Sequence, residues 1–174
     1  MARKRPKKIP LSLLLASFVF ATIILAALYY CSSAPQPKQP TVTIYLTKGD
    51  RLAAAERPLA KNDDRLGRAI AALLAGPTAA EKAGGLTTLI PGGTRVLHHR
   101  VKDGVAIVDF NRQLEDYGGG SARIEGIIAQ IVYTATEVPG VKKVWVRIEG
   151  NKEVVLGGEG LVLDKPLGRA DLRR

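Results

Sequence analysis

Residues 41–47 alternate strictly between apolar and polar residues, and residues 141–149 place Val144, Val146 and Ile148 on one face and Lys143, Trp145 and Arg147 on the other. A period of two predicts β-strands with one buried face. The apolar positions, which we expect to face the core, are Val42, Ile44, Leu46, Val144, Val146 and Ile148.

A period of about 3.6 residues predicts two main helices. The first follows Asn62-Asp63-Asp64, whose acids suit a helix start, and ends at Gly76-Pro77. The second begins with Ser121 as its cap and ends at Val138-Pro139-Gly140. Its apolar stripe is formed by Ile124, Ile127, Ile128, Ile131 and Ala135.

Shorter signals complete the pattern. Asp103-Gly104 between two β-rich runs, residues 94–101 and 105–110, predicts a hairpin. Thr78 and Glu81 have the spacing of a capping box around a short helical turn. Residues 48–61 are polar and irregular, with a possible short helical turn at 52–56. Residues 154–156 and 161–163 are short β-like runs, and the charged tail from Asp164 is expected to be loosely ordered.

The order strand, helix, hairpin, helix, strand predicts an α+β fold in which two helices pack on one face of a small mixed sheet. About 130 residues are enough for such a domain to bury its own core.

The longest apolar run lies near the N-terminus. Leu11–Tyr30 is 20 residues long and has no charged side chain, which predicts a transmembrane helix about 30 Å long. The net charge of +10 divides equally, because residues 1–10 contain five basic residues and no acid. Five positive charges before a first span hold that end in the cytoplasm, so the rest is expected to be extracytoplasmic.

Two alternatives to an uncleaved anchor stay open. One is a lipoprotein acylated at Cys31, although Tyr29-Tyr30 replace the small residues that usually precede such a cysteine. The other is a cleaved signal peptide, although the apolar run is longer than the usual core of 7–15 residues. The proline-rich residues 32–40 predict a stiff spacer after the anchor.

These boundaries divide the 174-residue chain into five segments. They are a basic cytoplasmic tail (1–10), a transmembrane anchor (11–30), a linker (31–40), a domain (41–164) and a charged C-terminal tail (165–174). The single cysteine excludes an internal disulfide framework and any multi-thiolate metal site.

Three stretches of the domain resemble the GerM domain of bacterial sporulation and germination proteins. They are LLAGPTAAEKAGGLTTLIPGGT, the hairpin end Val108-Asp109-Phe110, and GGGSARIEGIIAQIVYTATEVPGVKKVWVRIEG. The resemblance implies an extracytoplasmic, membrane-tethered domain with a fold like the ring-building motif. It also implies a role in assembly or scaffolding rather than catalysis.

No pattern of catalytic or metal-binding residues emerges, so we expect neither an enzyme nor a cofactor. His98 and His99 are the only histidines, and adjacent strand residues point to opposite faces, which disfavours a shared metal. Cys31 is far in sequence from both. We interpret Asp109, at the end of its strand, as a turn-capping carboxylate.

Two candidate binding features remain. Trp145 is expected on the open sheet face between Lys143 and Arg147, near Tyr45, and these residue types anchor protein interfaces. Coverage of this face by the segment 154–163 is the alternative. Gly119, Gly120 and Ser121 form a candidate anion site at the start of the second helix, although a glycine joint that lets the helix fold back on the hairpin is the favoured explanation.

The leading hypothesis is a membrane-anchored module that assembles with other envelope proteins or with itself. The alternative is a domain that binds cell-wall glycan or another anionic envelope polymer, since the exported part is also basic. Nucleic acid is not an expected partner, because the domain is predicted to face away from the cytoplasm.

Overall fold

The computed structural model describes residues 20, 22–27, 29, 39–156 and 161–172. The predicted anchor, Leu11–Tyr30, lies largely outside these residues, as do the basic tail and most of the linker. Its described residues are helical. Within the described parts of the chain, no helix has the length and apolar character needed to cross a bilayer. The compact unit that begins at Gln39 contains all the elements considered below.

The first element is an antiparallel hairpin of β1 (Thr41–Lys48) and β2 (Arg51–Pro58). Gly49, the first of two turn residues, has a φ of 59°, which glycine adopts without steric cost. The expected helical turn at residues 52–56 is therefore wrong. Cross-strand pairing along all eight residues of β1 outweighs the helix propensity of the alanine run.

Two helices follow as the sequence predicts. α2 (Arg65–Ala75) begins at the N-cap Asp64, whose side chain accepts hydrogen bonds from two amides of the first turn, and it ends at Gly76. The short α3 (Ala79–Ala83) carries the predicted capping box between Thr78 and Glu81.

An ion pair joins α3 to β2. Arg57 donates from both terminal nitrogens to the Glu81 carboxylate, at 2.8 and 2.6 Å. Hydrogen bonds from Arg57 and then from the amide of Thr78 lower the pKa of Glu81 from 4.5 to about 2.

A carboxylate with a depressed pKa in the folded state stabilises that state above its unfolded pKa, and the contribution disappears as it protonates. We therefore expect the free energy of unfolding of the wild-type chain to fall between pH 4.5 and about 2. The free energy of unfolding of the Arg57→Gln variant should fall less steeply as the pH is lowered over this range. Urea titrations at several pH values measure the difference. Glu81→Gln is the control, because it removes the titrating group and should flatten the profile similarly. Parallel profiles for wild type and Arg57→Gln would contradict the prediction.

The main sheet contains β3 (Val96–Lys102), β4 (Val105–Phe110) and β5 (Lys143–Ile148), in that order. β3 and β4 form the predicted antiparallel hairpin, with positive φ at both Asp103 and Gly104. β5 pairs parallel to β4, so the chain needs a crossover between them. This crossover contains a short 3₁₀ turn (Arg112–Glu115) and α4 (Ser121–Thr136).

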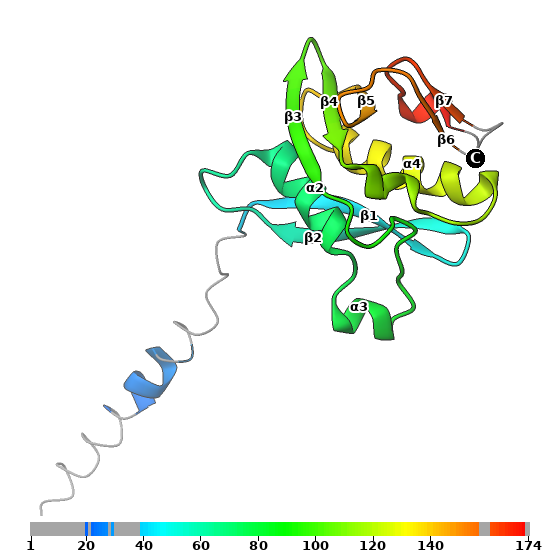
Figure 1. Cartoon of the computed structure of the whole chain (residues 1–174). Helices are drawn as coiled ribbons and strands as arrows, with labels where there is room; N and C mark the ends of the chain where they lie inside the picture. Colours follow the sequence, from blue (N-terminus) through cyan, green and yellow to red (C-terminus); the bar gives the residue numbers. More distant parts are fainter. Residues whose placement is uncertain (1–19, 21, 28, 30–38, 157–160, 173–174) are drawn as a thin grey trace, which may run out of the picture. The chain divides into compact units, whose positions relative to one another are not determined.

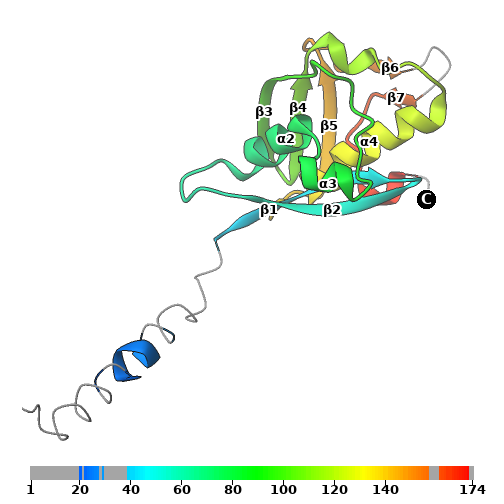
Figure 2. The ribbon, with the colours of Figure 1, turned by 90° about the horizontal axis from the view of Figure 1, so that it is seen from below.

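The helices α2 and α4 pack against each other and lie between the two β-layers (Figures 1 and 2). Both contact β1, while α2 also contacts β3 and α4 also contacts β5. The mixed α+β class is confirmed, and the two helices cover one face of the β3–β4–β5 sheet as predicted. β1, however, belongs to a separate two-stranded sheet on the other side of the helices.

The C-terminal segment packs on the domain. β6 (Val154–Leu156) and β7 (Leu161–Leu163) form an antiparallel hairpin, and Leu167 forms a two-way backbone bridge with Val144 of β5. A 3₁₀ turn (Arg169–Asp171) follows. The expected loose tail is therefore wrong for residues 164–172, because the buried Leu167 and the bonded Arg169 attach it to the core.

Candidate interaction surface

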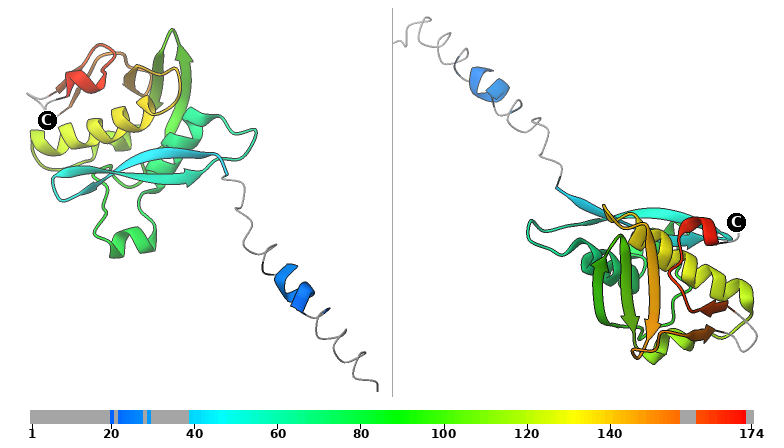
Figure 3. Two further views of the ribbon diagram at one scale, coloured as in Figure 1. Left: turned by 180° about the vertical axis from the view of Figure 1, so that it is seen from behind. Right: turned by 90° about the horizontal axis from the view of Figure 1, so that it is seen from above.

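The face of the main sheet opposite the helices is open. Figure 3 (right) shows β3, β4 and β5 with no other element in front of them. Strand alternation and the cross-strand register place nine residues on this side in three rows of three. We call this set the outer sheet face; its rows are Lys102–Val105–Lys143, Arg100–Ile107–Trp145 and His98–Asp109–Arg147.

Trp145 is held in place on the outer sheet face. Its indole nitrogen donates to the carbonyl of Lys152 at 3.3 Å, and the Arg147 guanidinium lies 4.5 Å from the ring centre. Both side chains are half-buried. The ring bonds Lys152, which lies between β5 and β6, and remains half-buried, so Trp145 is both held in place and partly accessible.

Asp109 confirms its expected capping role. Its side chain is buried and accepts a hydrogen bond from the amide of Gly150 at 3.0 Å, which ties the end of β4 to the turn after β5. This carboxylate is the one acid among the nine residues of the outer sheet face.

The expected proximity of Tyr45 to Trp145 is wrong. Tyr45 lies on β1, which pairs with β2 and packs on α4 rather than joining β5. Its ring meets Tyr133 edge-on at 5.3 Å, and its hydroxyl donates to Glu137 at 2.8 Å. The structure thus brings together Lys143, Trp145 and Arg147 but not Tyr45.

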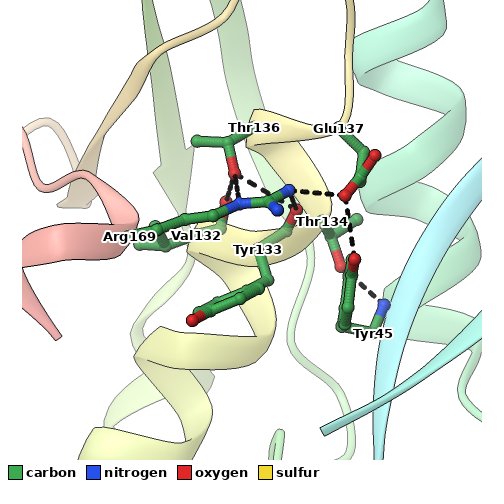
Figure 4. Close-up of polar contacts among 7 residues, drawn as sticks. All are labelled: Tyr45, Val132, Tyr133, Thr134, Thr136, Glu137 and Arg169. Atoms are coloured by element: carbon green, nitrogen blue, oxygen red, sulfur yellow. Dashed lines mark hydrogen bonds and ion pairs between the residues drawn. The ribbon is translucent and has the colours of Figure 1, made fainter. Parts of the chain in front are cut away.

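Tyr45 belongs to a structural cluster that binds the C-terminal segment (Figure 4). Arg169 donates to Glu137 at 2.6 Å and to the Thr136 hydroxyl at 2.8 Å, and its guanidinium lies 4.8 Å from the Tyr133 ring centre. Hydrogen bonds from Arg169 and then Tyr45 lower the pKa of Glu137. Burial, and then the hydrogen bond to Glu137, raise the pKa of Tyr45. Near neutral pH, Glu137 therefore stays ionised and Tyr45 stays protonated, which are the forms that the hydrogen bonds of the cluster require.

The candidate anion site has a different cap from the one predicted. Gly120, not Ser121, is the N-cap of α4, and no side chain caps this end. Ser121 is instead the first helical residue, and Gly118 and Gly119 before the cap both have positive φ, which glycine adopts without steric cost. Whether Gly119, Gly120 and Ser121 bind an anion stays a prediction.

The histidines lie on opposite sides of β3, as expected. His98 is on the outer sheet face, whereas the His99 ring bonds the Asp64 carboxylate at the start of α2, at 2.5 Å. Burial acts to raise the pKa of Asp64, but hydrogen bonds from His99 and the α2 amides outweigh it and lower the pKa. The described part of the chain has no group of three or more His, Cys, Asp or Glu residues arranged to hold a metal ion.

Sequence reasoning found the β5 part of the outer sheet face but missed the residues on β3 and β4. The Asp103-Gly104 turn does contain the signal, because a two-residue hairpin fixes the pairs Lys102–Val105 and Arg100–Ile107. No comparable local signal fixes the parallel register of β4 and β5.

The fold is a small mixed α+β domain, and its main sheet leaves one face uncovered by other elements. The chain belongs to the Germane family, whose model is described by the words sporulation and spore germination and matches residues 27–154. This confirms the resemblance to the GerM domain.

Among curated proteins, the spore germination protein GerM of Bacillus subtilis (strain 168) is 28% identical over 116 residues. The match covers 65% of this chain and 31% of that relative, so the chain spans about a third of the relative's length.

Solved structures share the fold. The first GerMN domain of the sporulation protein GerM from Bacillus subtilis has a TM-score of 0.61 at 24% identity, over 76% of this chain and all of that domain. The tandem GerMN domains give the same values but are covered over 47% of their length. A putative lipoprotein from Clostridium perfringens has a TM-score of 0.54 at 21% identity, over 76% of this chain and 88% of that protein.

Proposed function

We propose that this chain is a non-catalytic, membrane-anchored module that assembles with other proteins of a sporulation- or germination-type envelope complex. The observation that carries the proposal is the outer sheet face, which is uncovered and has an ordered, half-buried Trp145 stacked with Arg147. Tryptophan and arginine are the residue types that contribute most to binding at protein interfaces.

The remaining parts of the proposal rest on the sequence. The uncharged run Leu11–Tyr30 and the five basic residues before it support a single-pass anchor with the domain outside the cytoplasm. The linker, residues 31–40, would separate the domain from the membrane. Family membership supports the sporulation or germination context.

In-cell photo-crosslinking from position 143 tests the proposal. Lys143 is exposed and neighbours Trp145, so a photo-reactive residue there samples the face while leaving the Trp145–Arg147 stack intact. We expect discrete protein adducts in the membrane fraction, either with one other protein or as a ladder of self-adducts. Position 61, an exposed lysine outside the face, is the matched control.

Three results would contradict the proposal. Equal adducts from positions 143 and 61 would mean that the face has no specific partner. No protein adduct, together with retention of the chain on purified cell-wall material, would favour the anionic-polymer alternative. Recovery of the chain in the soluble fraction would contradict the anchor.

A further inference from the structure

We infer that the outer sheet face binds an acidic protein surface, one with carboxylates around an apolar centre. This inference rests on the proposed function, because it specifies the chemistry of the partner at the same face. Its evidence is the charge and the apolar content of the three rows, which the proposed function does not use.

The charge of the outer sheet face is strongly one-sided. Four cations occupy its two flanking strands: Arg100 and Lys102 on β3, and Lys143 and Arg147 on β5. Across the described residues, none of these four side chains forms an ion pair or a side-chain hydrogen bond. The one acid of the set, Asp109, is buried and bonded to the backbone. Among the described residues, the four cations therefore have no ion-pair partner within the chain.

The spacing of the cations makes their fields overlap. Cations on β3 and β5 are separated by two strand spacings, roughly 10 Å. This distance is comparable to the Debye length of about 8 Å at physiological ionic strength. A partner with several negative charges is therefore attracted to the whole face rather than to single side chains.

Arg147 adds a guanidinium whose orientation is fixed. Its Nε atom is buried and has no hydrogen-bond partner within the described structure. The guanidinium is held over Trp145, so its remaining nitrogens are oriented before any partner arrives. A carboxylate from a partner suits this fixed, planar group because it can bond two guanidinium nitrogens at once.

The apolar centre distinguishes a protein from a hydrated polymer. Val105, Ile107 and Trp145 occupy adjacent positions on the middle and β5 strands, and all three are half-buried. Their remaining surface gains free energy only when a partner excludes water from it. An apolar centre with a charged rim is the usual anatomy of a protein interface, whereas a hydrated anionic polymer would use the cations alone.

A second copy does not fit this face in a symmetric pair. A two-fold contact places the same patch on both sides of the interface. Here it would bring the four cations of one copy against those of the other, so the partner surface must differ in charge.

Trp145 also provides a specific reporter, since it is the one tryptophan of the chain. The full chain in a non-ionic detergent is titrated with a helical peptide that has a leucine stripe flanked by glutamates, and Trp145 fluorescence is recorded. Two further probes are the same peptide with glutamine at every glutamate, and poly(glycerol phosphate). We expect the acidic peptide to shift the fluorescence with saturation and to bind at least tenfold more tightly than either other probe.

Charge variants then locate the interaction. The double variant Arg100→Gln/Lys102→Gln should weaken binding of the acidic peptide at least about fivefold. The matched control Arg51→Gln/Lys82→Gln removes two exposed cations outside the face and should change the affinity less than twofold. Added salt should weaken binding to the wild type more than to the face variant.

Four outcomes would overturn the inference. Equal binding of the glutamine peptide would show that charge is not recognised, and tighter binding of poly(glycerol phosphate) would assign the face to a polymer. No saturable response to the acidic peptide, or equal effects of the two double variants, would remove the acidic partner from this face. The crosslinking from position 143 is independent of these probes. If position 143 gave specific adducts but the acidic peptide did not change Trp145 fluorescence, this inference alone would be overturned. The proposed function would still stand.

Discussion

Replacement of Phe110 by alanine is expected to lower the free energy of unfolding by about 3–5 kcal/mol. Phe110 is fully buried at the end of β4, the central strand, and pairs with Val96 of β3 and Ile148 of β5. Its removal leaves a cavity where the sheet meets the helices, and a close-packed interior closes such a cavity only in part. Urea unfolding of the full chain in detergent, followed by far-UV circular dichroism and Trp145 fluorescence, measures the loss.

Two control variants show whether the loss comes from the cavity at Phe110. Phe110→Leu keeps most of the apolar volume and should cost clearly less than alanine. Leu97→Ala, on β3, removes a side chain that is 42% exposed and should change stability by no more than about 0.5 kcal/mol. A loss below about 1 kcal/mol for Phe110→Ala, or a loss as large for Leu97→Ala, would contradict the predicted role of Phe110.

This prediction bears on one of the three stretches that carry the resemblance to the GerM domain. In Val108-Asp109-Phe110, the two apolar side chains are in the core and the carboxylate caps the amide of Gly150. Val108 and Phe110 therefore contribute to the core, and Asp109 connects β4 to the turn after β5. The candidate interaction residues lie elsewhere: Arg100 on β3 is outside all three stretches, whereas Trp145 belongs to the longest of them.

Local signals predicted the elements that depend on neighbouring residues. The caps of α2 and α3 use side chains within three residues of the amides they bond. The Asp103-Gly104 turn determines the β3–β4 hairpin, and the isoleucine stripe determines which side of α4 is buried. In each case the residues that determine the element lie within that element or directly beside it in the sequence.

Non-local pairing explains three predictions that were wrong: the sheet to which β1 belongs, the helical turn at residues 52–56 and the loose tail. Alternation in residues 41–47 correctly shows that one face of β1 is buried, but it does not specify a partner strand. Pairing with β2 requires the alanine-rich residues 53–55 to be extended, which depends on β1 rather than on their own propensity. Likewise, the tail is ordered by a bridge to β5 and by the contacts of Arg169 with α4, neither of which has a local pattern.

The position of β1 depends on two polar side chains of α4. Gln130 and Thr134 are fully buried in an otherwise apolar helix face. Thr134 accepts a hydrogen bond from the amide of Tyr45 at 2.9 Å, and Gln130 donates to the carbonyl of the same residue at 2.9 Å. Gln130 also accepts from the amide of Leu89 at 2.8 Å. These contacts satisfy the backbone of Tyr45 on the edge of β1 that faces away from β2, and Thr47 on the same edge pairs with Thr87.

Gln130→Leu is therefore expected to lower the free energy of unfolding by about 2–4 kcal/mol, although leucine has a similar size and is apolar. The substitution leaves the carbonyl of Tyr45 and the amide of Leu89 without their partners, and each unsatisfied buried group costs about 1–3 kcal/mol. Urea unfolding measures the total loss, and hydrogen exchange at the Leu89 amide, which should accelerate, shows where it arises.

Gln113→Leu is the matched control, because it makes the same exchange at an exposed position in the 3₁₀ turn after β4. It should change stability by no more than about 0.5 kcal/mol and leave the Leu89 amide protected. If Gln130→Leu were neutral or stabilising, the added apolar burial would outweigh the two lost bonds. The attachment of β1 to α4 would then rest on the hydrogen bond from the Tyr45 amide to Thr134 and on the buried side chains Ile44 and Leu46, and the buried amide of Gln130 would need another explanation.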